Sequence, residues 1–470
     1  MPREWEPVVG LEIHVQLKTR TKMFCRCENV WGAEPNTRTC PVCLAHPGAL
    51  PVPNGQAIAW AVKLGLALGC EIADRALFHR KNYFYPDLPK GYQISQYDSP
   101  LCGPGRFLVP EPDADREIGI VRAHLEEDAA KTVHIGGAGG RISGAAHSLV
   151  DFNRGGTPLV EIVTEPDIRS PEEARRFLGL LRQTVVELGI SDAEMEKGSL
   201  RCDANVSVRE RGETGLRTKT ELKNMNSFKF VGDGIAAEVA RQIAVYEEGG
   251  EVVQETLHFD PASGRISALR SKEEAHDYRY FPEPDLVPVE PPPDLLERMR
   301  AEVPELPGAR IRRLQAEVGY GLASELVGSG RDGLLAPIVG HGVEARAAAN
   351  FLMNDYTGDG TGDGDPALIA ETIKRRRELP PEVYRDAAAA ASSGDAAAVT
   401  RLLEQRAISD VEELDPVVDA VLAENEAQVA AYRGGKAGLL GFFVGQVMQR
   451  TGGKADPRAV NERLRSKLDP

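Results

Sequence analysis

The sequence changes character at a Pro-rich segment, residues 282–293, and this change limits the folds open to the chain. Before the segment, short runs alternate apolar and polar residues between Gly, Pro and Asn, as expected of β-strands. After it, Ala, Glu, Arg and Leu dominate, which favours short packed helices. A run of prolines is typical of a linker. We therefore predict an α+β protein with its β-rich part first, and 470 residues leave room for two or three domains.

Four alternating segments predict strands in the β-rich part: residues 11–17, 118–125, 159–164 and 200–209. One helix, predicted over residues 171–188, interrupts them. Ser170 is a suitable N-cap, Pro171 suits the first helical position, and Glu172 and Glu173 suit the first turn.

The charge distribution argues against broad nucleic-acid binding, because the net charge is -15 and such binding needs a basic surface. The C-terminal stretch is an exception, with eight basic residues against three acidic ones from Arg433 onward. It is either a solvated helix face or a local nucleic-acid surface. The first residues contain no apolar signal segment, and no apolar run is long enough for a membrane span. We expect a cytoplasmic protein without a membrane partner.

Four of the seven cysteines fall close together: Cys25, Cys27, Cys40 and Cys43. Thiolates are soft ligands, and two pairs at this spacing predict a structural zinc ion with a complete tetrahedral shell. Reduced or redox-active cysteines are the alternative. The other three cysteines have mostly apolar neighbours and are expected in the core.

Period-two alternation predicts strands with one apolar and one polar face. In residues 11–17 the polar face carries Glu12, His14 and Gln16, and residues 201–209 divide in the same way. Several such strands could form one sheet with a polar concave face, which would suit phosphates and a divalent cation. An ordinary half-exposed strand is the simpler interpretation of each one.

Glu161 stands between aliphatic residues, so burial would demand a partner, either a metal ion or a buried Arg or Lys. The acids of residues 126–128 suit magnesium, although a plain acidic turn also explains them. Neither a P-loop nor a dinucleotide fingerprint occurs, so any ATP site must be of another kind. No Gly-x-Ser-x-Gly elbow or Ser-Ser-Lys arrangement occurs, and an amidase activity would have to come from another chain.

Several ordered motifs nevertheless make the sequence similar to the GatB components of the tRNA-dependent amidotransferase GatCAB. They are VGLEIHVQL at 9–17, CPVCL at 40–44, NYFYPDLPKGYQISQ at 82–96, HLEED at 124–128, RCDAN at 201–205, ELKN at 221–224, DYRYFPEPD at 277–285 and GFFVGQVM at 441–448. The stretch 135–146 is longer than usual for that family, and the similarity is weak over residues 295–410.

The resemblance implies a β-rich antiparallel cradle domain over residues 1–294, a helical domain over 295–408 and a tRNA-binding helical tail over 409–470. It implies a ligase that forms a carbon–nitrogen bond with glutamine as amido donor. In that reaction, ATP phosphorylates the side-chain carboxylate of Glu-tRNA(Gln) or Asp-tRNA(Asn). Ammonia from a partner amidase, the GatA component of GatCAB, then travels through a channel and displaces phosphate. The small GatC component is the other expected partner.

The resemblance also assigns residues. The Mg2+ ligands would be His14, Glu127 and Glu161, with Glu12 and Asp203 beside them. Strand alternation places Glu127 opposite Glu126, so this assignment requires a bulge or a strand end. The substrate and ATP cleft would contain Lys81, Tyr83 and Lys90, and the structural zinc would bind the four clustered cysteines. The residues expected to hold tRNA in the tail are Arg450, Lys454, Arg458 and Arg463.

Two other functions fit parts of the sequence. A non-catalytic, zinc-bearing, tRNA-binding scaffold would explain the cysteines and the basic tail, but it leaves Glu161 and the polar strand faces without a purpose. A metal-dependent nuclease or phosphohydrolase would use the same acids, and it would act alone.

Overall fold

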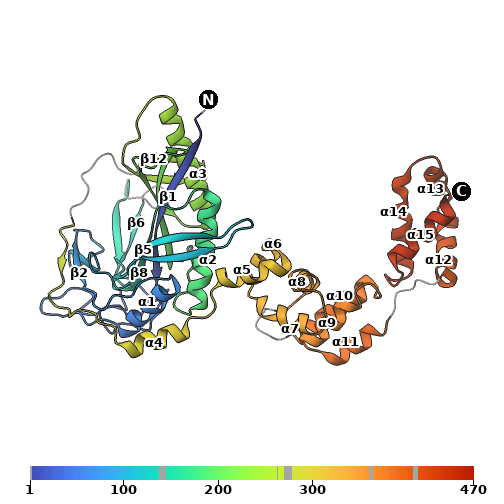
Figure 1. Cartoon of the computed structure of the whole chain (residues 1–470), viewed down its shortest axis with the longest axis horizontal. Coiled ribbons are helices and arrows are strands. Elements are labelled where there is room, and N and C mark those ends of the chain that lie inside the picture. Colours follow the sequence, from blue (N-terminus) through green and yellow to red (C-terminus); the bar gives the residue numbers. More distant parts are fainter. Residues whose placement is uncertain are drawn as a thin grey trace. The chain divides into compact units, whose positions relative to one another are not determined.

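The computed structural model describes residues 3–136, 144–261, 263–268, 278–358, 364–405 and 411–469. The chain forms two compact units, Met1–Ala309 and Arg310–Pro470. The first is β-rich and the second contains helices, so the predicted α+β class is confirmed (Figure 1). Among the described helices, none combines the length and apolar character needed to cross a membrane.

An eight-stranded sheet organises the first unit, in the order β12-β11-β10-β9-β1-β8-β5-β4. Among the described strands, only β10 and β11 pair in parallel, so the sheet is mixed rather than wholly antiparallel. The four predicted strands are all present, each longer at one or both ends. The strands are β1 (Trp5–Gln16), β4 (Gly105–Val109), β5 (Arg116–Glu127), β8 (Pro158–Thr164), β9 (Leu200–Glu210), β10 (Thr220–Met225), β11 (Thr256–Asp260) and β12 (Arg265–Ala268).

Two small sheets accompany the large one. One has the order β13-β2-β3 and is formed by β2 (His79–Asn82), β3 (Tyr92–Ser95) and β13 (Phe281–Pro282). The other is a two-stranded ribbon of β6 (Lys131–Ile135) and β7 (His147–Asp151). The strand β13 joins residues that are two hundred positions apart in the sequence, because Phe281 pairs with Arg80.

The first unit contains more helices than predicted. The predicted one is present as α2 (Pro171–Glu187), and the Ser170 hydroxyl accepts a hydrogen bond from the Glu173 amide at 3.1 Å. However, α1 (Gly55–Ala67) and α3 (Phe228–Glu247) also occur, while α4 (Pro293–Glu302) begins at the end of the Pro-rich segment, where helices were predicted. The prediction of a single helix was wrong: α1 buries most of its residues and so shows little 3.6-residue periodicity.

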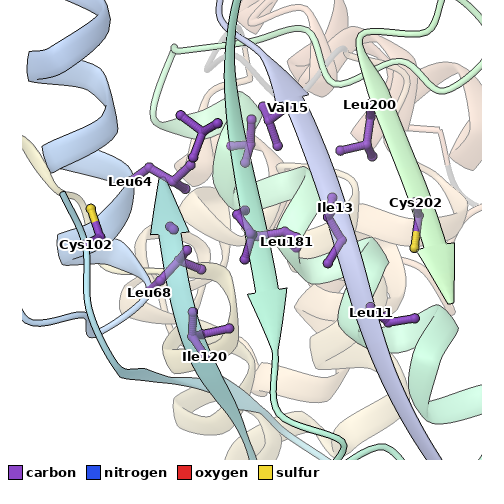
Figure 2. Close-up of a cluster of buried hydrophobic side chains, with 14 of the residues drawn as sticks. Leu11, Ile13, Val15, Leu64, Leu68, Cys102, Ile120, Leu181, Leu200 and Cys202 are labelled. Carbon is purple, nitrogen blue, oxygen red and sulfur yellow. The ribbon is translucent and has the colours of Figure 1, made fainter. Parts of the chain in front are cut away.

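The core lies on one face of the large sheet. Leu11, Ile13 and Val15 of β1 are at most 1% exposed, and they meet Leu181 of α2 and Leu64 of α1 (Figure 2). Successive side chains of a strand point to opposite faces, so packing these residues inward turns the alternate residues of β1 to the other face. The polar face of the sheet is therefore a consequence of how the core is packed.

The second unit contains only helices among its described residues. The final four share a core with Val418, Phe443 and Leu464 at its centre. The predicted border at residues 408 and 409 lies outside the described residues. The helices are α5 (Pro307–Val318), α6 (Tyr320–Gly328), α7 (Leu335–Gly340), α8 (Ala345–Asn354), α9 (Pro366–Lys374), α10 (Pro381–Ser392), α11 (Ala396–Leu403), α12 (Val411–Glu424), α13 (Glu426–Arg433), α14 (Leu440–Arg450) and α15 (Pro457–Leu468).

Truncating the core contact of α2 tests this packing. Leu181→Ala leaves a cavity under the sheet and should destabilise the first unit by about 2–5 kcal/mol. All three tryptophans belong to this unit, so urea unfolding followed by tryptophan fluorescence reports on it. On the same helix, Val186 is 41% exposed, and Val186→Ala should change the free energy of unfolding by less than about 0.5 kcal/mol. Equal effects of the two changes would contradict the packing.

Candidate functional site

Strand register creates a row of ionisable residues on the polar face. In the β1–β8 ladder His14 is opposite Glu161, and in the β5–β8 ladder His124 is opposite the same Glu161. Side chains directly opposite each other lie close together on one face of an antiparallel pair. Glu126 follows His124 by two positions, so it shares this face.

These side chains form a compact cluster. His14 Nε2 lies 3.3 Å from a Glu161 oxygen and 3.5 Å from a Glu126 oxygen. His124 Nε2 lies 3.7 Å from Glu161. One ligand atom each from His14, Glu126 and Glu161 can be chosen so that all lie within 4.8 Å of one another. We call these three residues the acidic cluster, and their donor set of one imidazole and two carboxylates is able to hold one divalent cation.

The electrostatics of the acidic cluster favour a cation. Burial lowers the pKa of His14, but the hydrogen bond to Glu161 and the charge of Glu126 outweigh burial and raise it above 6.5. Burial and the neighbouring Glu161 raise the pKa of Glu126. Burial opposes ionisation of Glu161 too, yet His124 and His14 hold its pKa below the usual range. Two buried carboxylates ionise together only with added positive charge, which a divalent cation supplies.

The structure brings Glu126, rather than Glu127, to His14 and Glu161. Strand β5 continues in regular register through Glu127, so no bulge turns that side chain toward the cluster. Instead the Glu127 carboxylate accepts hydrogen bonds from the Lys90 ammonium and, at 3.0 Å, from the Ile94 amide. Period-two alternation with His124 was the signal that could have identified Glu126.

The neighbouring strands extend the polar face. Glu12 and Asp203 are opposite each other in the β1–β9 ladder, as expected for residues beside the cluster. Asn205 donates to Glu12 at 2.9 Å, and Lys223 donates to Asp203 at 2.9 Å. Both carboxylates therefore have an amide or ammonium partner, whereas Glu161 faces two imidazoles and Glu126 faces His14 and the Ser95 hydroxyl.

Arg201 was not predicted as a site residue, although it lies opposite His14 in β9. Its guanidinium donates to buried Asp128 at 2.7 Å. Asp128 also accepts from Gln16 at 2.7 Å. The Arg201–Asp128 ion pair therefore lies next to His14 on the polar face. The position of Arg201 on the polar face of a predicted strand could have identified it as a site residue.

The three residues predicted to line the substrate cleft, Lys81, Tyr83 and Lys90, have different partners in the structure. Lys81 in β2 has its ammonium 4.9 Å from the centre of the Tyr278 ring, and no carboxylate of the described residues forms an ion pair with it. Burial lowers the pKa of Lys81, but the charge of Glu126 leads the effects that raise it above its usual value. The Tyr83 hydroxyl lies 3.5 Å from Gln93. Lys90 is paired with Glu127, so Lys81 is the cation left available near the acidic cluster.

The four clustered cysteines also come together. Cys25, Cys27, Cys40 and Cys43 each place a sulfur within 4.8 Å of the others, and all four are half-buried free thiols. Lys22 beside them is completely buried, and its ammonium lies 3.8 Å from Cys43 Sγ and 3.1 Å from the Phe152 carbonyl. A buried ammonium needs a negative partner, and Cys43 would supply one in its thiolate form. A cavity of about 230 Å³ separates this cysteine cluster from the Lys90–Glu127 pair.

In the tail the predicted basic residues divide into two kinds. Arg463 forms a bidentate ion pair with Asp415, and Arg450 pairs with Glu424. Lys454 and Arg458 are exposed and form no ion pair with the described residues. The first two therefore connect helices of the tail, whereas the last two offer charge to solvent.

The first unit thus defines a candidate metal protein, with an acidic site on the sheet and a sulfur site beside it. Comparison with protein families gives two matches: the GatB/GatE catalytic domain over residues 7–297 and the GatB domain over residues 386–468. The chain belongs to the GatB family, which confirms the resemblance found in its motifs.

Full-length relatives agree with this membership. The B-type subunit of the aspartyl/glutamyl-tRNA(Asn/Gln) amidotransferase of Moorella thermoacetica is 46% identical over 482 residues, which is 99% of this chain and 100% of the relative. The protein of the same name from Persephonella marina is 44% identical over 483 residues, again 99% of this chain and 100% of the relative.

The electrostatics of the acidic cluster predict how His14 titrates without metal. Followed by NMR of labelled histidine in magnesium-free buffer, His14 should titrate above 6.5, whereas His124 should stay neutral because burial lowers its pKa to about 4. Glu161→Gln removes a carboxylate and should lower the pKa of His14. Because that pKa is raised by folding, its contribution to stability is complete below pH 6.5 and is lost as pH rises through the raised value. A His14 pKa unchanged by Glu161→Gln would contradict the contact.

Proposed function

We propose that this chain activates the side-chain carboxylate of misacylated Glu-tRNA(Gln) or Asp-tRNA(Asn) with ATP, and amidates it. The γ-phosphoryl group would move from ATP to a carboxylate oxygen, releasing ADP. Ammonia would then attack the acyl carbon, form the C–N bond and expel phosphate. Ammonia would come from glutamine through a partner amidase, in a complex with a small third protein. The names and full-length similarity of the relatives support this proposal. We propose that the reaction takes place in the cytoplasm.

The acidic cluster is the observation that carries the proposal. His14, Glu126 and Glu161 would hold Mg2+, which when bound neutralises charge on a phosphate group. Lys81, which has no carboxylate partner among the described residues, would bind phosphate oxygens nearby. Arg201 and Lys223 are already paired, with Asp128 and with Asp203 and Glu221, so a bound metal ion and Lys81 would supply the positive charge for anionic substrates. A scaffold that only binds tRNA gives these buried carboxylates no task.

Substrate-dependent ADP release tests this function. The full-length chain, co-purified with its amidase and small partner proteins, would be given ATP, magnesium and either Glu-tRNA(Gln) or correctly charged Gln-tRNA(Gln). We expect ADP only with the misacylated tRNA, and losses of at least about 100-fold in His14→Ala and Glu161→Gln, which remove charge stabilisation of the transferring phosphate. Equal ADP release with both tRNAs, or none, would contradict carboxylate activation and favour the scaffold.

We further propose that the cysteine cluster holds structural zinc. Four thiolates around Zn2+ leave an excess of negative charge, and the buried Lys22 ammonium at 3.8 Å from Cys43 compensates part of it. Four protein ligands leave no open position, so this metal would stabilise the fold rather than react.

Zinc content provides the corresponding prediction. The wild-type chain should contain one zinc ion, and Cys40→Ser should lose it because the shell becomes incomplete. Lys22→Met removes the compensating charge and should weaken zinc binding by about 10–100-fold, the range seen for residues that support metal ligands. A chelator competition assay measures both. Cys70→Ala, outside the cluster, should retain zinc. Normal affinity in Lys22→Met would show that Lys22 does not support the metal.

We also propose that the tail binds the tRNA backbone through its unpaired cations. Lys454→Ala and Arg458→Ala should each make the slope of log affinity against log salt shallower by about one, since each would remove a phosphate contact. Glu462→Ala, on α15 with Arg458, is the control and should leave the slope unchanged or slightly steeper. Filter binding over a salt series measures the slopes. Slopes equal to wild type in both cation variants would exclude this surface.

A further inference from the structure

Two tyrosines, one exposed and one half-buried, form a stack at one end of the small β13-β2-β3 sheet. Tyr97 follows β3 and Tyr280 precedes β13, and their ring centres lie 4.3 Å apart with planes only 7° from parallel. Although one face of Tyr97 is covered by Tyr280, the residue remains 53% exposed. A stacked ring with this much exposed surface presents an open aromatic area to solvent.

The stack lies beside the acidic cluster. Lys81 belongs to β2, the central strand of the same small sheet, and its ammonium packs on the Tyr278 ring next to Tyr280. Burial raises the pKa of Tyr280; the charge of Lys81 opposes this rise, and the charges of Glu161 and Glu126 add to it. The aromatic stack and the available cation therefore border the same charged site.

A second pair of stacked rings, Trp5 and Tyr246, provides a comparison in which the protein itself covers the rings. Trp5 and Tyr246 also stack, at 5.6 Å, but the guanidinium of Arg217 lies over both rings, at 5.0 and 4.9 Å. Over the residues that the structure describes, no such cation lies on Tyr97 or Tyr280. One stack is thus covered by an arginine, whereas the other has only T-shaped ring contacts beside it among the described residues, His79 with Tyr97 and Tyr278 with Tyr280, and leaves Tyr97 53% exposed.

We propose that the Tyr97–Tyr280 stack is a nucleobase platform that binds adenine. Bases stack on aromatic side chains through their π-faces, and the neighbouring Lys81 ammonium suits the phosphates attached to a nucleoside. This inference rests on the proposed function, in which two substrates carry adenine: ATP and the 3′-terminal adenosine that bears the amino acid. The shared chemistry is the stacked adenine, and binding experiments distinguish the two sources.

Equilibrium binding to the full complex tests the platform without requiring turnover. One arm measures a non-hydrolysable ATP analogue with magnesium, and the other compares RNA hairpins ending in CCA or in CC. Tyr97→Ala should weaken binding of either the analogue or the CCA hairpin by about 5–100-fold, from the loss of one stacking layer. Tyr97→Phe keeps the ring and should stay within about twofold of wild type. Tyr246→Ala, which opens the distant stack, is the matched control.

Loss confined to the analogue would assign the platform to ATP, and loss confined to the CCA hairpin would assign it to the tRNA end. Unchanged binding in both arms, or equal loss in Tyr246→Ala and Tyr97→Ala, would overturn the proposal. Because binding is measured without turnover, it separates two failures. A Tyr97-sensitive affinity without ADP release would retain the platform and reject the proposed function. Normal ADP release together with an affinity that does not depend on Tyr97 would reject the platform and retain the proposed function.

Discussion

The register of three neighbouring strands is the constraint on which the site depends. Because His14 and His124 both lie opposite Glu161, one carboxylate is held between two imidazoles from strands distant in sequence. The register is maintained by the other face, where Ile13, Val15 and Ile162 are fully buried. A slip by one residue would turn these side chains to the polar side and His14 to the core. The packing of the core therefore fixes the positions of the site residues.

The loop at Gly156 connects the segments that carry the acidic cluster and the cysteine cluster. The Gly156 amide donates to the Asp128 carbonyl at 2.9 Å, and the Met23 amide donates to the Gly156 carbonyl at 2.7 Å. Gly156 has φ of 86°, a left-handed backbone conformation that favours glycine at this position. A metal bound by the cysteines would steady the loop that precedes β8, the strand of Glu161.

Much of this arrangement could be predicted from the sequence. The alternating strands, the Ser170 cap and the cysteine spacing are local signals, and each gave the correct element or grouping. The helices α1 and α3 were missed, and so was the parallel pairing of β10 with β11, which depends on contacts between distant segments. Motif similarity favoured Glu127, whereas alternation with His124 along β5 favours Glu126. The register of β5 against β8 agrees with the alternation. Partners such as Lys22 for Cys43 arise from tertiary packing, which no spacing reveals.

The central claim is that strand register makes His14, Glu126 and Glu161 one divalent-cation site. Mn2+ binding followed by electron paramagnetic resonance tests it most directly, with the adjacent variants Glu126→Gln and Glu127→Gln compared in the full-length chain. The register predicts that Glu126→Gln abolishes tight Mn2+ binding, while Glu127→Gln, whose side chain points to Lys90, retains it. Loss of binding in Glu127→Gln with normal binding in Glu126→Gln would contradict the account.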